Sequence, residues 1–307
     1  MTGTLPTSTA VGVEPLAGNI GAEITGVNTG GPLTDDAVAG IRQALLRYKV
    51  VFLRDQDLDY PRQVAFASRL GPLTLGHPTL ASPPGQPLLE QIDSHKGGRA
   101  NYWHTDVTFV DRPPAITLLH AVIIPPVGGD TLWANTVTAY QSLPAELRDL
   151  ADRLRVVHTN DHDYASVYGR GERVDAARAA QLEQFVSTVY HTEHPAVRVH
   201  PETSERALLL GGFAQAVLGF SPDASRDLIR LLQDYITRPE NTVRWRWREG
   251  DLAIWDNRAT EHYAIFDYQG AHRRGERVTV AGPVPIGVDG RPSVALRGDA
   301  SAYYAGE

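Results

Sequence analysis

Trp103-His104-Thr105-Asp106 places a histidine and an aspartate two residues apart, and far downstream His262 follows Trp255-Asp256-Asn257-Arg258. On an extended backbone, side chains two residues apart project to the same side, so His104 and Asp106 can face one ion. Two imidazoles and one carboxylate are a ligand set typical of non-heme Fe(II) centres, which leave one face of the metal open. We therefore predict that His104, Asp106 and His262 are the metal ligands and the catalytic residues, provided that the two segments meet in space.

The assignment of His262 as the third ligand depends on its context, because a His-x-Asp pair alone occurs by chance in many proteins. Residues 252–255 are predicted to form a strand that passes into an irregular turn before His262. A metal ligand suits such a place, where a rigid scaffold meets a cavity. The alternative is that Asp256 and Asn257 only build the turn and that His262 lies on the surface.

Two arginines, Arg273 and Arg277, follow the distal histidine. On a strand they would share one face with Thr279. The planar fork of arginine makes two parallel, charge-assisted hydrogen bonds to a carboxylate or a sulfate. We expect Arg273 and Arg277 to hold anionic ligands beside the metal. The alternative is that they face solvent on an edge strand, as we expect for the arginines of 243–248.

The composition argues against several classes of protein. The 307 residues carry a formal net charge of −7, whereas a general nucleic-acid binder needs a basic surface. No cysteine is present, so any metal must be held by nitrogen and oxygen ligands. The sequence shows no early apolar block after a charged segment and no apolar run of about 20 residues. We therefore expect a cytoplasmic protein without membrane contact.

Short strand-like segments predominate, with a few helices between them. This balance predicts a mainly β fold with flanking helices, a double-stranded β-helix or jelly roll. We expect a single domain over residues 1–307, with loose tails at 1–10 and about 286–307. The segment 159–190 is expected to be a lid or binding loop. The predicted strands include 50–53, 115–124, 196–199, 207–210, 243–248, 252–255 and 277–280, and the predicted helices begin near Thr34, Pro61, Ser142 and Ser221.

The sequence resembles the taurine dioxygenase family of Fe(II)/2-oxoglutarate-dependent oxygenases from about residue 10 to 283, and its pattern is closest to the alkyl sulfate dioxygenases of that family. The spacing of the shared stretches is as specific as their residues. These stretches are Trp103-His104-Thr105-Asp106-Val107-Thr108-Phe109, Pro126-Val127-Gly128-Gly129-Asp130-Thr131-Leu132-Trp133, Val243-Arg244-Trp245-Arg246-Trp247 and Ile254-Trp255-Asp256-Asn257-Arg258-Ala259-Thr260-Glu261-His262.

The resemblance implies roles at the metal and for the cosubstrate. His104, Asp106 and His262 match the ligands of the family's Fe(II). Thr131 matches the residue that hydrogen-bonds the 2-oxoglutarate carboxylate near the metal. Arg273 matches the residue that pairs with its far carboxylate. The implied cofactor is Fe(II), with 2-oxoglutarate and O2 as cosubstrates.

The resemblance also implies a substrate pocket. Arg277 matches a second arginine, which lies near the cosubstrate and beside the sulfonate or sulfate of the substrate. His77 matches a substrate-side histidine, and Val107 and Phe213 match positions that line the pocket. Taurine-specific members have a tyrosine three residues past this histidine, where this chain has Leu80. We therefore expect an alkyl sulfate or a longer alkylsulfonate rather than taurine.

The implied reaction hydroxylates the carbon next to a sulfate or sulfonate group, and the product collapses to an aldehyde plus sulfate or sulfite. Succinate and CO2 are released from 2-oxoglutarate. The binding partner that the resemblance implies is a small anionic organosulfur substrate. Because members of the family are often dimers or tetramers, the resemblance also implies a homo-oligomer, a dimer or tetramer. The alternatives are a taurine dioxygenase proper, an oxygenase of an aryloxyacetate-type carboxylate and, in a different class, a non-catalytic metal-binding cupin-like protein.

Overall fold

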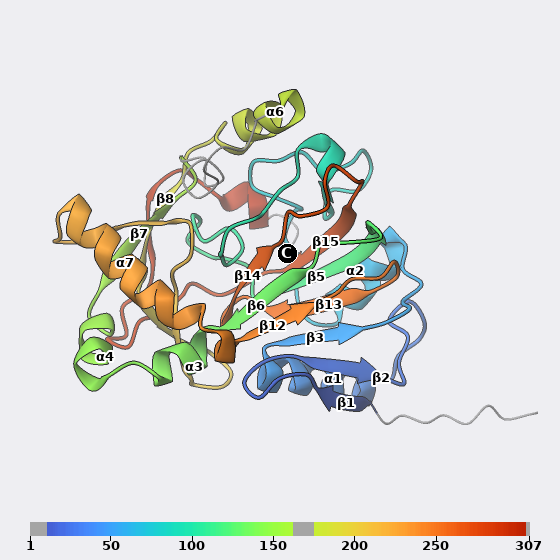
Figure 1. Ribbon diagram of the computed structural model, residues 1–307, viewed down its shortest axis with the longest axis horizontal. Helices are drawn as coiled ribbons and strands as arrows, with labels where there is room; N and C mark the ends of the chain where they lie inside the picture. The colour runs from blue at the N-terminus through green and yellow to red at the C-terminus, as the bar shows by residue number, and fades with distance from the viewer. Residues whose placement is uncertain (1–10, 162–174, 305–307) are drawn as a thin grey trace, which may run out of the picture.

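The computed structural model describes residues 11–161 and 175–304, which form several β-sheets with helices around them (Figure 1). The largest sheet has seven strands in the order β1-β2-β3-β13-β5-β15-β4. Its β2–β3 pair is parallel and its other pairs are antiparallel. Its strands are β1 (Gly12–Pro15), β2 (Ala22–Thr25), β3 (Val50–Leu53), β4 (Glu90–Asp93), β5 (Ile116–Ile123), β13 (Leu252–Asp256) and β15 (Arg274–Val280).

Three smaller antiparallel sheets complete the β structure, in the orders β12-β6-β14, β11-β7-β8-β16 and β10-β9. The β9–β10 pair is a hairpin formed by the two strands predicted at 196–199 and 207–210. Their strands are β6 (Thr131–Asn135), β7 (Arg155–Thr159), β8 (His191–Pro195), β9 (Val197–Val199), β10 (Arg206–Leu208), β11 (Ala214–Val217), β12 (Thr242–Trp245), β14 (Thr260–Ala264) and β16 (Val294–Arg297).

The helices pack on the outer sides of these sheets (Figure 1). Helices α1 and α2 cover one face of the seven-stranded sheet, and α3, α4 and α7 pack with the β9–β10 hairpin. Within the described residues, no helix is long and apolar enough to cross a membrane. The helices are α1 (Asp35–Tyr48), α2 (Tyr60–Ser68), α3 (Thr136–Gln141), α4 (Ala145–Ala151), α6 (Ala176–Phe185) and α7 (Pro222–Ile236), with 3-10 turns η1 (Ser94–Lys96), η2 (Pro239–Asn241) and η3 (Ser301–Tyr304).

Helix α1 shows how local sequence sets these elements. The Thr34 hydroxyl accepts a hydrogen bond from the backbone N–H of Ala37 at 3.2 Å, which caps the helix as predicted. Ile41 and Leu45, at helical spacing, are fully buried against the large sheet. Lys49 ends the helix with a left-handed backbone and leads directly into β3.

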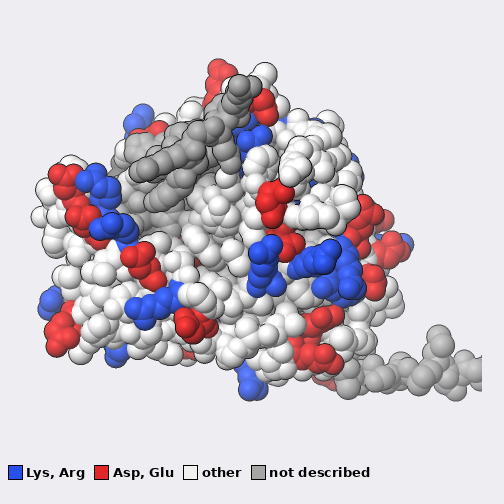
Figure 2. All heavy atoms as spheres, viewed as in Figure 1, with Lys and Arg blue, Asp and Glu red and all other residues white. Residues whose placement is uncertain are grey.

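A layer of aromatic side chains fills the space between the seven-stranded sheet and the three-stranded sheet. Phe52 of β3 stacks on Trp245 of β12 with 4.2 Å between ring centres. The arginines of 243–248 face solvent as expected: Arg244, Arg246 and Arg248 are exposed, and they alternate with the buried Trp245 and Trp247. The regular strand ends earlier than predicted, at Trp245. On the face shown in Figure 2, acidic and basic side chains are intermixed.

The C-terminal segment differs from the loose tail expected for residues 286–307. Strand β16 pairs with β8, and Tyr303 is buried. The Tyr303 carbonyl accepts a hydrogen bond from the N–H of Leu75 at 2.9 Å, and the Tyr304 hydroxyl accepts one from the N–H of Arg112 at 3.0 Å. Residues 286–304 are therefore part of the fold, while 1–10 and 305–307 lie outside the described residues.

Two buried histidines, one on β7 and one on β8, link these strands to the segment that follows Asp106. His158 Nδ1 lies 2.9 Å from the Thr108 hydroxyl, and His194 Nε2 donates to the Thr108 carbonyl at 2.6 Å. Burial is the main cause that lowers the pKa of His194 to about 3, and the charge of Arg198 acts in the same direction. Burial also holds the pKa of His158 well below its usual value. Both rings are therefore neutral in the folded protein at pH 7.

We predict that acidification from pH 7 to pH 5 lowers the free energy of unfolding. In the unfolded chain these histidines take up protons near pH 6.5, whereas in the folded protein they do not, so their stabilisation is complete above pH 6.5 and is lost as the pH falls toward 3. Each contributes a slope of up to about 1.4 kcal/mol per pH unit. Urea denaturation at several pH values measures this dependence. The free energy of unfolding should change less per pH unit for His194→Gln than for the unchanged protein.

Thr192→Val is the matched control for this measurement. Thr192 lies on the same strand, is buried and donates to the Phe109 carbonyl at 2.8 Å. Its loss should lower stability by a similar amount at every pH. If His194→Gln left the slope unchanged, the buried neutral state of His194 would be refuted.

Candidate metal centre and active site

Two backbone hydrogen bonds hold the segments that carry the histidine ligands together. The N–H of His104 donates to the carbonyl of His262 at 3.0 Å, and the N–H of His262 donates to the carbonyl of His104 at 2.7 Å. The Thr105 hydroxyl adds a bond to the Thr260 carbonyl at 2.7 Å. The segment after Trp103 is thereby fixed against β14, so the two segments do meet in space.

The three predicted ligands converge on one point. One ligand atom from each of His104, Asp106 and His262 lies within 4.8 Å of the others, and all three side chains are buried. Asp106 Oδ1 lies 3.9 Å from His104 Nε2 and 3.7 Å from His262 Nε2. A single divalent ion fits between these atoms. The alternative in which His262 lies on the surface is wrong, because its exposed fraction is 6%.

The protonation states suit a divalent ion. His104 Nδ1 donates to the Tyr102 carbonyl at 2.9 Å, which leaves the lone pair on Nε2 for a metal. Burial lowers the pKa of both His104 and His262. Burial opposes ionisation of Asp106, but the charge of the Arg277 guanidinium and the hydrogen bond from Thr117 hold its pKa far below its usual range. Two neutral imidazoles and one carboxylate are the deprotonated ligands that metal binding requires.

A chain of hydrogen bonds fixes the orientation of Asp106. The Thr117 hydroxyl of β5 donates to Asp106 Oδ2 at 2.7 Å and accepts from Asn257 Nδ2 at 2.7 Å. Asn257 Oδ1 in turn accepts from the Trp255 indole N–H at 3.0 Å. Asn257 therefore does more than build a turn, because it links the strand end to the carboxylate ligand.

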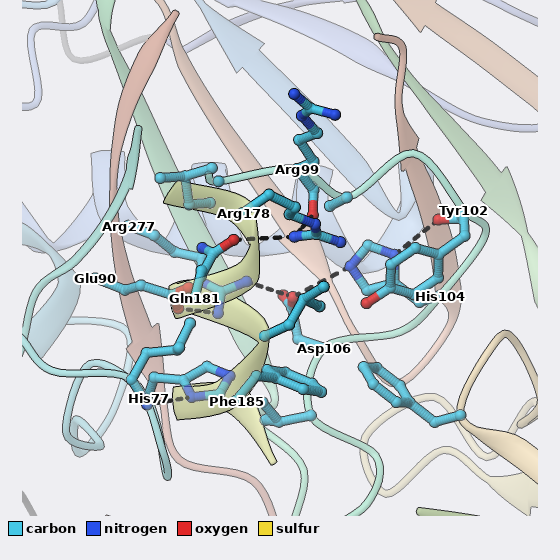
Figure 3. A pocket seen from close by; sticks show the side chains of 17 residues that line it. His77, Glu90, Arg99, Tyr102, His104, Asp106, Arg178, Gln181, Phe185 and Arg277 are labelled. Atoms are coloured by element: carbon cyan, nitrogen blue, oxygen red, sulfur yellow. Dashed lines mark hydrogen bonds and ion pairs between the residues drawn. The ribbon is translucent and has the colours of Figure 1, made fainter. Parts of the chain in front are cut away.

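One cavity opens onto the ligands His104 and Asp106, and all four predicted substrate-side residues line it. Figure 3 shows two of these four, His77 and Arg277, on the same side of the cavity as Glu90. Val107 has a φ of 41°, an unusual backbone conformation for a β-branched residue. The polar part of the wall holds His77, Glu90, Arg99, Tyr102, His104, Asp106, Arg178, Gln181 and Arg277, and the apolar part includes Leu80, Ile92, Val107, Leu182, Phe185 and Phe213.

Arg277 is held between two carboxylates. Its Nη1 donates to Asp106 Oδ1 at 2.5 Å, and its Nη2 forms an ion pair with Glu90 of β4. Its Nε is buried and has no hydrogen-bond partner among the described residues. Burial raises the pKa of Glu90, and the charge of Arg277 opposes this shift. No sequence motif marks Glu90, because its role comes from its place opposite Arg277 in the β4–β15 register.

His77 presents a neutral donor to the cavity. Its Nδ1 accepts hydrogen bonds from the backbone N–H groups of Thr79 at 3.1 Å and Leu80 at 3.0 Å, so the proton is on Nε2. Burial lowers the pKa of His77 to about 3, and the Arg277 charge acts in the same direction. His77 therefore offers one N–H group without a positive charge.

Arg273 and Thr131 form a second group next to the metal ligands. Arg273 Nε donates to the Gly129 carbonyl at 3.0 Å, and Nη2 lies 3.4 Å from the Thr131 hydroxyl. Arg273 is 7% exposed and makes no ion pair within the described part of the chain; burial lowers its pKa. The β6–β14 register puts Thr131 on the same sheet face as His262.

Helix α6 supplies a cavity wall whose individual residues the sequence did not indicate. Arg178, Gln181, Leu182 and Phe185 of this helix line the cavity, and Arg178 Nη1 donates to Gln181 Oε1 at 2.9 Å. They lie in the segment expected to be a lid or binding loop, of which residues 162–174 lie outside the described structure. No motif marks these residues, because a short helix of mixed composition shows no periodic signal for a ligand.

Comparison with known proteins identifies the family. The chain matches the family described as "Taurine catabolism dioxygenase TauD, TfdA family" over residues 12–279. The chain belongs to this family. TauD/TfdA members with similar sequences include an "Alpha-ketoglutarate-dependent sulfate ester dioxygenase" of Pseudomonas putida, which is 50% identical over 96% of this chain and 97% of its own length. An "Alkylsulfatase" of Acinetobacter baylyi is 48% identical over 91% of this chain and 87% of its own length.

Solved structures agree with this assignment. A taurine dioxygenase from Burkholderia xenovorans superposes with a TM-score of 0.80 and 41% identity, over 96% of this chain and 98% of that one. As a TauD/TfdA member, the protein is a 2-oxoglutarate-dependent dioxygenase with Fe(II) at His104, Asp106 and His262. This excludes the non-catalytic cupin-like alternative.

We predict that Thr117→Val weakens Fe(II) binding about 10- to 100-fold, because Asp106 loses the hydrogen bond that orients it. Anaerobic Fe(II) titration would measure this. Thr29→Val is the matched control, since it removes a buried hydroxyl that bonds Gln56 Oε1 at 2.9 Å, away from the metal ligands. Equal Fe(II) affinities for the two variants would contradict the orienting role of Thr117.

Proposed function

We propose that this dioxygenase cleaves alkyl sulfate esters by hydroxylating the carbon bonded to the ester oxygen. One observation carries the proposal: a single cavity joins metal ligands, anion-binding donors and an apolar wall. The two relatives at about half identity, one named for sulfate esters and one named an alkylsulfatase, point to the same substrate class. The geometry of the cavity and the similarity to these two relatives therefore support the same substrate class.

The two ends of an alkyl sulfate suit different parts of the cavity. We assign the sulfate to Arg277 and His77, because Arg277 Nε has no partner among the described residues and His77 Nε2 carries a proton. We assign the alkyl chain to the wall that contains Leu80, Val107 and Phe213. Burial of this chain contributes about 25 cal/mol per Å² of apolar surface removed from water.

The reaction follows from this placement. Bound iron, with 2-oxoglutarate and O2, supplies the hydroxylation of the C–H bond and leaves succinate and CO2. The protein holds the sulfate so that the adjacent carbon faces the metal ligands. The hydroxylated ester, R–CH(OH)–OSO3−, then loses its hydroxyl proton, forms the C=O bond of an aldehyde, and breaks the C–O bond to release sulfate with its electron pair.

We predict that a medium-chain alkyl sulfate releases succinate faster than taurine or an aryloxyacetate does under Fe(II). His104→Ala should abolish turnover of all three, because it removes a metal ligand. Leu80→Tyr should lower kcat/KM for the alkyl sulfate roughly 10-fold by overfilling the tail site. Leu88→Tyr, in the same region but outside the cavity wall, is its control. A clear preference for taurine or for the aryloxyacetate would establish one of the two alternative substrates instead.

The cosubstrate is assigned to the second group. We place the far carboxylate of 2-oxoglutarate on Arg273 and its metal-side carboxylate beside Thr131. Arg273 supports this assignment, because it is buried and makes no ion pair with the described residues. A buried guanidinium without a carboxylate is costly, so an anionic ligand stabilises it.

We predict that Arg273→Gln weakens 2-oxoglutarate binding by about 2–4 kcal/mol, which is about 30- to 1,000-fold in KM. The KM for the sulfate ester should change little. Arg230→Gln makes the same change in net charge on an exposed part of α7 and should leave both constants unchanged. An unchanged KM for 2-oxoglutarate in Arg273→Gln would refute the assignment.

Some expectations from the sequence stay proposals. We interpret the seven-stranded and three-stranded sheets, with the aromatic layer between them, as the two sides of a double-stranded β-helix. We also keep the proposals of a single domain, a homo-oligomer and a cytoplasmic location. The match to one family over residues 12–279 supports the single domain.

A further inference from the structure

Trp247 belongs to the alternating stretch 243–248, and the proposed function above gives it no role. Its side chain is 5% exposed, and its indole N–H donates to the Thr131 hydroxyl at 2.9 Å. The Arg273 guanidinium carbon lies 5.9 Å from the centre of its ring. Trp247 therefore contacts both residues to which the cosubstrate is assigned.

The hydrogen bonds of the Thr131 hydroxyl can be counted. A threonine hydroxyl accepts at most two hydrogen bonds and donates one. Trp247 Nε1 donates to it at 2.9 Å, and Arg273 Nη2 donates more weakly at 3.4 Å. Both acceptor positions are thus used, and no acceptor for the hydroxyl proton occurs among residues 11–161 and 175–304. The proton is left for a ligand.

We propose that Trp247 is a positioning residue for 2-oxoglutarate, which aims the Thr131 O–H at the cosubstrate and keeps the Arg273 guanidinium beside it. The inference rests on the proposed cosubstrate site at Thr131 and Arg273. A hydroxyl group rotates about its C–O bond. Without the indole donor, the Thr131 O–H would therefore also occupy orientations that point away from the cosubstrate. Trp247 thus stabilises the one rotamer of the O–H that meets the ligand carboxylate.

Trp245 shows that this arrangement is specific to Trp247 and not to the alternating pattern. Trp245 is equally buried, but its indole N–H donates to Asp251 Oδ2 at 3.1 Å, and its ring stacks on Phe52 in the core. Trp245 pairs with Thr131 in the β12–β6 register, but its indole N–H donates to Asp251 and not to the Thr131 hydroxyl. The two tryptophans therefore differ in what their N–H groups bind, which makes one a control for the other.

The first test measures 2-oxoglutarate binding by calorimetry on the Fe(II)-loaded protein without O2. Trp247→Phe removes the donor and should raise the Kd about three- to tenfold, the loss expected for one hydrogen bond. The KM for 2-oxoglutarate should rise by the same factor, while kcat at saturating cosubstrate and the KM for the sulfate ester stay within twofold. Trp245→Phe should lower the melting temperature but leave the Kd within twofold. Equal Kd values for Trp247→Phe and the unchanged protein overturn the proposal.

A double-mutant cycle tests whether Trp247 acts through Thr131. Thr131→Val should weaken 2-oxoglutarate binding, and adding Trp247→Phe to it should cause little further loss, because the hydroxyl that the indole orients is already gone. Additive losses overturn the proposal. Trp247→Tyr should behave as Trp247→Phe does, and it replaces that variant if the phenylalanine form does not fold.

Arg273→Gln separates failure of this inference from failure of the cosubstrate assignment. If Arg273→Gln and Thr131→Val both weaken 2-oxoglutarate binding but Trp247→Phe does not, the site is correct and the role of Trp247 is wrong. If none of the three variants changes the Kd, the cosubstrate binds elsewhere and the inference falls with the site.

Discussion

The reciprocal backbone hydrogen bonds between His104 and His262 are the constraint on which the active site depends. They do not involve the side chains that bind metal, so both imidazoles stay free to act as ligands. They also tie a loop to β14, the edge strand of the three-stranded sheet, and so give an irregular segment the rigidity of regular structure. Asp106 follows two residues later and is fixed by Thr117 of the seven-stranded sheet. The metal centre therefore lies where the two sheets are tied together.

Aromatic packing buries the His262 side of this centre. Trp255 lies 4.9 Å and Trp133 lies 6.4 Å from the His262 ring, measured between ring centres, and Trp133 in turn packs near Trp247. This packing explains why burial is the largest cause of the lowered pKa of His262. A site that disfavours protons on its histidines favours a metal ion there, because the ion binds the same lone pairs.

The sequence predicted those features that have a local signal. Strand 50–53 coincides with β3, the cap at Thr34 starts α1, and the His-x-Asp and distal His motifs meet as expected. The segment 159–190 was expected to be a lid or binding loop, but the individual α6 residues and Glu90 were not predicted, because their roles depend on which elements become neighbours, and that is set by tertiary packing. The C-terminal segment was missed for a related reason. Strand β16 has only three apolar residues in a row, Val294–Leu296, and all four of its residues are exposed, so its order comes from pairing with β8 and from Tyr303.

The left-handed backbone of Val107 limits how the cavity can change in evolution or in the laboratory. A β-branched residue in this conformation carries a cost of about 1–3 kcal/mol, which the surrounding structure must offset. Glycine would relieve that cost while it enlarges the space beside Asp106, whereas isoleucine would keep the cost and fill more space. A substitution at this position that enlarges the cavity thus lowers the backbone cost, whereas one that makes the cavity smaller keeps that cost. Enzymes that descend from this one should therefore drift more readily toward bulkier molecules than toward smaller ones.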